Sequence, residues 1–150
     1  MGLTRLRGFL RRHQRIAMDT SVFIYQLENN PRYTDLTNHV FAWLEQTGHA
    51  AVASTITMTE LLVQPYRMSD FQQVNEFYAL LSTYPNLDWV APSLLVADTA
   101  ARIRAAHRLR TPDALQAATA IQSQATGLVT NDAVFERVKE IETLVLEHLL

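Results

Sequence analysis

Short apolar runs that suit buried strands alternate with longer helical stretches from residue 15 to the end of the chain. Strands are expected at 16–18, 50–56, 89–90, 128–130 and 143–146. Helices are expected at 20–28, 34–47, 58–65, 69–82, 93–109, 111–125 and 133–139. Because strands that alternate with helices pair in parallel, this order predicts an α/β fold with a parallel sheet covered on both faces. No internal repeat divides it, so 15–150 is expected to form one domain.

The segment 1–14 differs from the rest of the chain in charge. Of the 13 basic residues, five are arginines within residues 1–15, a stretch without any acid, so the remainder holds 8 basic against 15 acidic side chains. Leu3, Leu6 and Leu10 recur at helical spacing, which predicts a short amphipathic helix. Two interpretations of this basic N-terminal arm stay open: a solvated or partner-packed extension, and an arm that contacts RNA.

Composition excludes several classes of protein. The chain contains no cysteine, which rules out disulfides, thiolate catalysis and cysteine-based metal sites. No apolar run approaches the roughly 18 residues that span a bilayer, and the N-terminus lacks the apolar core of a secretory signal. A cytoplasmic globular protein is therefore expected, and its acid-rich body is unusual for a nucleic-acid binder.

Four carboxylates stand where the predicted strands end or the following helices begin. Asp19 follows the first strand, Asp132 follows the strand at 128–130, Asp113 lies in a first helical turn, and Glu60 follows the second strand. In open parallel sheets these positions share one edge, which is also where ligands bind. The sequence therefore predicts that the four carboxylates meet in one site.

Each carboxylate also has a purely structural explanation. Thr57-Met58-Thr59-Glu60 has the pattern of a helix capping box. Asp113 complements the dipole of the helix that begins at Thr111, and Asp19 and Asp132 suit helix caps. Taken singly, each residue is explained equally well by structure and by function.

Together the four carboxylates call for a cation. Two of them about 4 Å apart repel by about 1 kcal/mol in water and by ~4 kcal/mol at an effective dielectric of 20. Oxygen ligands select hard ions, so Mg²⁺ or Mn²⁺ is expected, with an activated water as nucleophile. The neighbouring hydroxyl and amide groups of Thr20, Ser21, Thr130 and Asn131 could assist by binding an anion or water, or could serve only as caps.

Four segments resemble those of the PIN-domain nucleases, in particular the VapC-type toxins of toxin–antitoxin pairs. They are 16–25 (IAMDTSVFIY), 57–61 (TMTEL), 110–120 (RTPDALQAATA) and 128–135 (LVTNDAVF). The resemblance implies a three-layer α/β/α sandwich and hydrolysis of RNA by metal-activated water. It also implies a homodimer and a cognate antitoxin that blocks the site. The family usually begins near the first strand, so the basic arm is a departure.

The resemblance also implies roles for individual residues. Asp19, Asp113 and Asp132 would bind the metal directly or through water, and Glu60 would orient water or a second ion. Four arginines are candidates for phosphate contacts near Asp113, or belong to a solvated helix face: Arg102, Arg104, Arg108 and Arg110.

Rival functions fit the sequence less well. A phosphatase of the haloacid-dehalogenase type would need an acid two residues after Asp19, where Ser21 stands. A phospho-receiver domain would need a late lysine at the site, and the only lysine, Lys139, lies in a short predicted helix after the last of the four carboxylates. The non-enzymatic alternative is a PIN-like module that binds nucleic acid or protein without catalysis.

Overall fold

The computed structural model describes all 150 residues. Five strands form one sheet in the order β3-β2-β1-β4-β5, and every neighbouring pair is parallel. The strands are β1 Arg15–Met18, β2 Ala50–Ser54, β3 Leu87–Val90, β4 Gly127–Thr130 and β5 Glu142–Val145. The predicted parallel sheet is thus confirmed, with β1, which precedes Asp19, at its centre.

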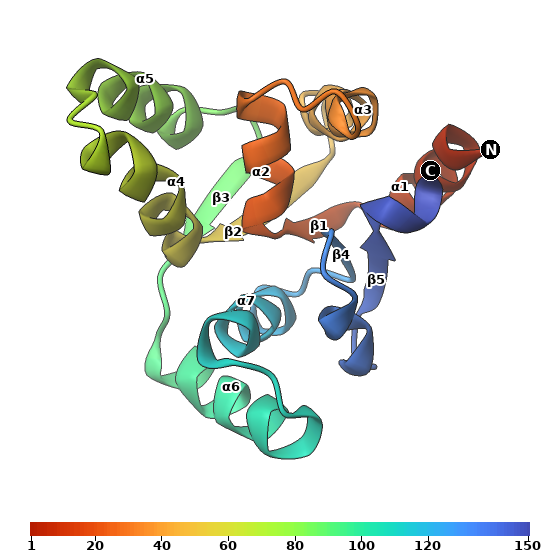
Figure 1. Cartoon of the computed structure of the whole chain (residues 1–150). Helices are drawn as coiled ribbons and strands as arrows, with labels where there is room; N and C mark the ends of the chain where they lie inside the picture. Colours follow the sequence, from red (N-terminus) through yellow and green to blue (C-terminus); the bar gives the residue numbers. More distant parts are fainter.

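Helices cover both faces of the sheet (Figure 1). One face carries α1 Gly2–Arg12, α2 Thr20–Leu27, α3 Thr34–Leu44, α4 Thr55–Arg67 and α5 Phe71–Ser82. The other carries α6 Leu94–His107, α7 Thr111–Gln122 and the 3-10 helix η1 Ala133–Arg137, while a second 3-10 helix, η2 Leu146–Leu149, ends the chain. This is the predicted α/β/α sandwich. None of its helices has the length and apolarity needed to cross a membrane.

Strand β1 divides its side chains between the two layers of the core. Ile16 and Met18 belong to the cluster under α1 to α5, and Ala17 belongs to the cluster under α6 and α7. This alternation follows from the two-residue period of a strand. On the second face the alanines of α7 are fully buried, and side chains this small let the helix, which carries Asp113, lie close to the sheet.

The amphipathic helix predicted in the basic segment exists as α1, and its apolar side is part of the main core. Leu6, Phe9 and Leu10 are buried in the same cluster as β1. Gly127 at the start of β4 permits this packing, because a Cβ there would lie 2.6 Å from Cζ of Phe9. Helix α1 is therefore folded against the sheet, and its basic side faces solvent.

The start of α4 differs from the prediction. The sequence predicts a strand to residue 56 and a capping box at Thr57 and Glu60, but β2 ends at Ser54 and α4 begins at Thr55. The cap is Ser54, whose hydroxyl accepts from the backbone N–H of Ile56 at 3.2 Å. The capping-box interpretation is wrong because Thr57 already lies inside the helix with its side chain buried, which leaves both Thr57 and Glu60 free for other partners.

Candidate metal centre

All four predicted carboxylates line one pocket of about 260 Å³ at the carboxyl ends of β1 and β4. Asp19 and Asp132 follow these two strands, Asp113 projects from the first turn of α7, and Glu60 comes from α4. The wall also includes Thr20, Ser21, Tyr25, Arg110, Gln116 and Asn131. The structure therefore brings the four acids to one place, as the strand-end argument predicts.

Asp19 is the most enclosed of the four carboxylates. Its Oδ1 accepts from the backbone N–H of Thr20 and its Oδ2 from the hydroxyl of Thr130, both at 2.8 Å. Burial, with a smaller contribution from repulsion by Asp113 and Glu60, raises the pKa of Asp19 to about 6, although these two hydrogen bonds lower it. Because a nearby cation would favour the charged form, Asp19 is the natural centre of a metal site.

Glu60 accepts a hydrogen bond from the end of a buried polar chain. The hydroxyl of Thr20 donates to Oε1 of Glu60 at 2.7 Å. Since that hydroxyl has only one proton, the 2.9 Å contact between Thr57 and Thr20 must be donated by Thr57, which in turn accepts from Gln116 Nε2 at 2.9 Å. We call this chain, Gln116 to Thr57 to Thr20, the threonine relay. Its three side chains are buried, so it fixes the position of Glu60 from the interior.

Asp113 and Asp132 each make one interaction of a structural kind. Asp113 forms an ion pair of 3.4 Å with Arg110, whose side chain is 80% exposed. Asp132 is exposed and caps η1 by accepting from the backbone N–H of Val134 at 3.0 Å. Each interaction occupies one carboxylate oxygen, so the other oxygen of each residue remains available.

The carboxylates do not form a closed cage. No three acidic or histidine side chains lie close enough together to hold a metal ion jointly. Mg²⁺ does not require such a cage, because it commonly keeps several waters and takes only one or two carboxylates from the protein. The all-oxygen donor set and the raised pKa of Asp19 fit a hard divalent ion of this kind.

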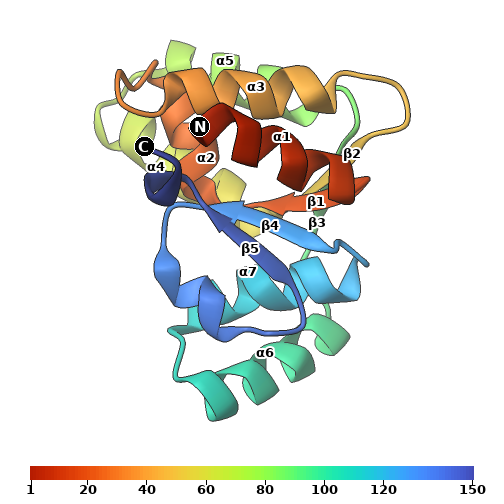
Figure 2. The same ribbon diagram turned by 90° about the vertical axis from the view of Figure 1, so that its right-hand side faces the viewer.

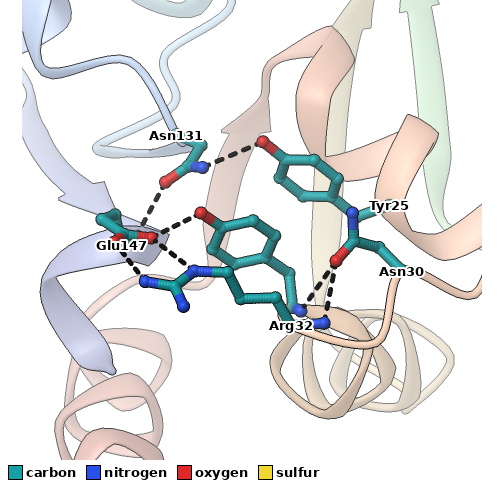
Figure 3. A network of polar contacts seen from close by, with 6 residues as sticks. Tyr25, Asn30, Arg32, Asn131 and Glu147 are labelled. Carbon is teal, nitrogen blue, oxygen red and sulfur yellow. Dashed lines mark hydrogen bonds and ion pairs between the residues drawn. The ribbon is translucent and has the colours of Figure 1, made fainter.

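A second polar network ties the end of the chain to the loop beside Asp132 (Figure 3). Asn131 donates from Nδ2 to the hydroxyl of Tyr25 at 2.9 Å and accepts from the backbone N–H of Glu147 at 2.8 Å. The Glu147 carboxylate accepts from Arg32 and from the hydroxyl of Tyr33, and the Arg32 hydrogen bond lowers its pKa to about 2. Sequence reasoning missed both Tyr25 and Glu147, which hold Asn131 from opposite sides.

The fold and the acidic pocket define a class of α/β proteins with a candidate metal site at the sheet edge. The model of one family in this class, described as "PIN domain", matches residues 16–141. The chain therefore belongs to the PIN-domain family. Members of this family are typically nucleases and generally bind divalent metals. Helix α1 lies outside the matched segment.

Solved structures share the fold at low sequence identity. A toxin–antitoxin complex from Klebsiella pneumoniae is 23% identical with a TM-score of 0.65, covering 84% of this chain and 94% of that one. VapBC-1 from nontypeable Haemophilus influenzae is 19% identical with a TM-score of 0.70, covering 89% and 98%. VapBC2 from Rickettsia felis, bound to a promoter DNA fragment, is 17% identical with a TM-score of 0.67, covering 87% and 98%. Among proteins with curated descriptions, none matches the sequence.

Proposed function

We propose that this protein is a divalent-metal-dependent endoribonuclease that hydrolyses RNA phosphodiester bonds, and that it is the toxin of a toxin–antitoxin pair. The observation that carries the proposal is the convergence of Asp19, Glu60, Asp113 and Asp132 on one pocket of a PIN domain. The pocket is lined by no cysteine, histidine or lysine, and a metal-bound water needs no nucleophile from the protein, so hydrolysis by water is the chemistry that it supports best.

Asp19, Asp113 and Asp132 would hold Mg²⁺ or Mn²⁺, directly or through water. The bound ion supplies positive charge that neutralises phosphate oxygens and lowers the pKa of water. Glu60 would orient the attacking water, since the threonine relay holds its Oε1 and leaves Oε2 free to accept a proton.

The four polar neighbours would assist by positioning. Thr130 and the backbone of Thr20 hold the two oxygens of Asp19. Ser21 accepts from the backbone N–H of Asn131 at 3.2 Å and so joins the start of α2 to the loop after β4. These contacts set the separation of Asp19 and Asp132, the two acids that follow the neighbouring strands β1 and β4.

The activity is tested by incubating cellular RNA with the protein in Mg²⁺, in Mn²⁺ and in EDTA. We expect cleavage that needs metal and that is lost in Asp113→Asn and Glu60→Gln but kept in Asp98→Asn, which replaces an exposed acid on α6. Metal binding by calorimetry should weaken in Asp113→Asn. Identical RNA patterns with Mg²⁺ and EDTA would instead favour the alternative function, a PIN-like module that binds nucleic acid or protein without cutting it.

The proposed partners are a cognate antitoxin and a second copy of the chain. Structural relatives have been solved as toxin–antitoxin complexes. Large apolar side chains on α4, on α5 and in the turn between them are exposed, which suits burial against a partner: Tyr66, Met68, Phe71, Tyr78 and Leu80. Sedimentation velocity of the purified chain tests the dimer, and co-purification with the product of a neighbouring small reading frame tests the antitoxin. A monomer that no such product binds would contradict both.

A further inference from the structure

Helices α1 and α3 lie side by side on the outer surface of one layer (Figure 2). A groove of about 310 Å³ separates them, and it lies away from the carboxylate pocket, with which it shares no lining residue. Its apolar part is formed by Leu10, Ala42 and Trp43, and its basic part by Arg7, Arg11 and His39. We refer to it as the α1–α3 groove.

The arginines of the N-terminal segment divide into two sets. Arg12 pairs with Glu142 at 2.6 Å, Arg15 pairs with Asp88 at 3.1 Å, and Arg5 donates to the carbonyl of His148 at 2.8 Å. Arg7 and Arg11 make no ion pair, and no carboxylate lines the groove. Since they are four residues apart on one helix, their side chains lie on the same face, and the groove carries two uncompensated positive charges.

His39 orients one of these charges without neutralising it. Its Nδ1 lies 3.0 Å from the carbonyl oxygen of Asp35, which can only accept, so Nδ1 carries the ring proton. Its Nε2 therefore accepts from Arg7 Nη2 at 3.3 Å, and the ring is neutral in this arrangement. The other N–H groups of the Arg7 guanidinium remain available, and a guanidinium of this kind matches the oxygens of a phosphate.

We propose that the α1–α3 groove binds a phosphodiester of single-stranded RNA, with Arg7 and Arg11 on the phosphate and the apolar floor under the adjoining nucleoside. This rests on the proposed RNA substrate. The carboxylate pocket repels a polyanion, and the body of the chain is acid-rich, so a nuclease of this composition needs positive charge elsewhere to hold its substrate. The unpaired arginines supply it, and apolar surface beside them suits a splayed base better than a paired duplex.

The test is RNA binding in EDTA, where the proposed cleavage cannot occur. A fluorescein-labelled mixed-sequence single-stranded RNA is titrated with wild type and with the Arg7→Gln, Arg11→Gln double variant, and binding is measured by anisotropy. We expect the double variant to bind about tenfold more weakly, and the slope of log K against log salt to become shallower by roughly 0.7, the value for one lost phosphate contact on a single strand. Both replaced side chains are exposed, so the melting temperature should stay within about 2 °C of wild type.

The control is a second double variant, Arg137→Gln with Lys139→Gln, which removes the same charge from the opposite layer of the sandwich at two exposed positions. It should retain wild-type affinity, and equal losses in the two double variants would overturn the proposal. The ring signals of His39 in the NMR spectrum, assigned with His39→Gln, should move when RNA is added to wild type. If they do not move, RNA does not occupy the groove.

Two further outcomes separate this proposal from others. Wild type that binds RNA through the groove but never cuts it would refute the nuclease and leave the groove proposal intact. If wild type cuts RNA but the Arg7→Gln, Arg11→Gln double variant binds it equally tightly, the groove proposal is refuted and the nuclease proposal stands. A glutamate-rich peptide that binds wild type but not the double variant, with RNA affinity equal in both, would make the groove a peptide site and overturn the RNA assignment.

Discussion

The burial of Asp19 predicts a pH-dependent stability of the metal-free protein. The pKa of Asp19 rises from 3.8 to about 6 on folding, so the charged carboxylate is disfavoured in the folded state. Below the unfolded pKa the residue is protonated in both states and has no effect; as the pH rises toward 6 it increasingly lowers stability. Each pKa unit corresponds to about 1.4 kcal/mol, so the deficit is about 3 kcal/mol well above pH 6 and about 2 kcal/mol larger at pH 7.5 than at pH 4.5.

The assay compares wild type with Asp19→Asn by urea unfolding in EDTA at both pH values. The variant should gain about 2 kcal/mol relative to wild type between pH 4.5 and 7.5, equivalent to roughly 4–8 °C in melting temperature for a chain of this size. The substitution also disturbs the hydrogen bonds that Asp19 accepts from Thr20 and Thr130. That effect is the same at both pH values, so it cancels when the two stability differences are subtracted. Saturating Mg²⁺ should shrink the gap at pH 7.5 by stabilising only wild type. A gap that does not change with pH would refute the reasoning, and Asp98→Asn, whose side chain is 71% exposed, is the control.

Four other variants test the packing and the two polar networks. Thr57→Val breaks the threonine relay in a buried setting and should lower the free energy of unfolding by about 1–3 kcal/mol, measured by urea titration. Asn131→Ala should lower kcat/KM for RNA cleavage about tenfold, because it releases the loop before Asp132. Its control is Glu147→Gln, which should leave kcat/KM unchanged because the backbone N–H of residue 147 still donates to Asn131. Phe9→Ala should lower the free energy of unfolding by about 3–5 kcal/mol, and a thermal shift like that of a surface variant would show that α1 is not part of the core.

The sheet and the strand ends were predictable because the residues of a strand that is buried on both faces are apolar. β1 is covered on both faces, so Ile16, Ala17 and Met18 are all apolar, and the first polar residue after them has to leave the sheet. The same argument places Asp132 after β4. The position of these acids at one edge thus followed from local sequence plus a general rule of parallel sheets, while their roles in metal binding remain a proposal.

The threonine relay could not be predicted by the same means. Ser54 and Thr57 are both acceptable helix caps, and nothing in the nearby sequence decides between them. The choice is made by α7, whose Gln116 meets the Thr57 hydroxyl across the core. One signal was available: Gln116 is the only amide within the alanine-rich stretch from Ala114 to Ala120, and a polar group on so apolar a helix face needs a partner.

The link between Glu147 and Asn131 couples the packing of η2 to the loop that carries Asp132. Helix η2 is held against α1, because Leu146 and Leu149 lie in the same buried cluster as Leu6, Phe9 and Leu10. If η2 opened locally, the side-chain oxygen of Asn131 would lose the backbone N–H of Glu147, and the loop before Asp132 would lose that support. Elements with few buried contacts open at a lower free energy than core strands. The order of the acidic pocket therefore depends on the local stability of η2, an element that contributes no residue to the pocket.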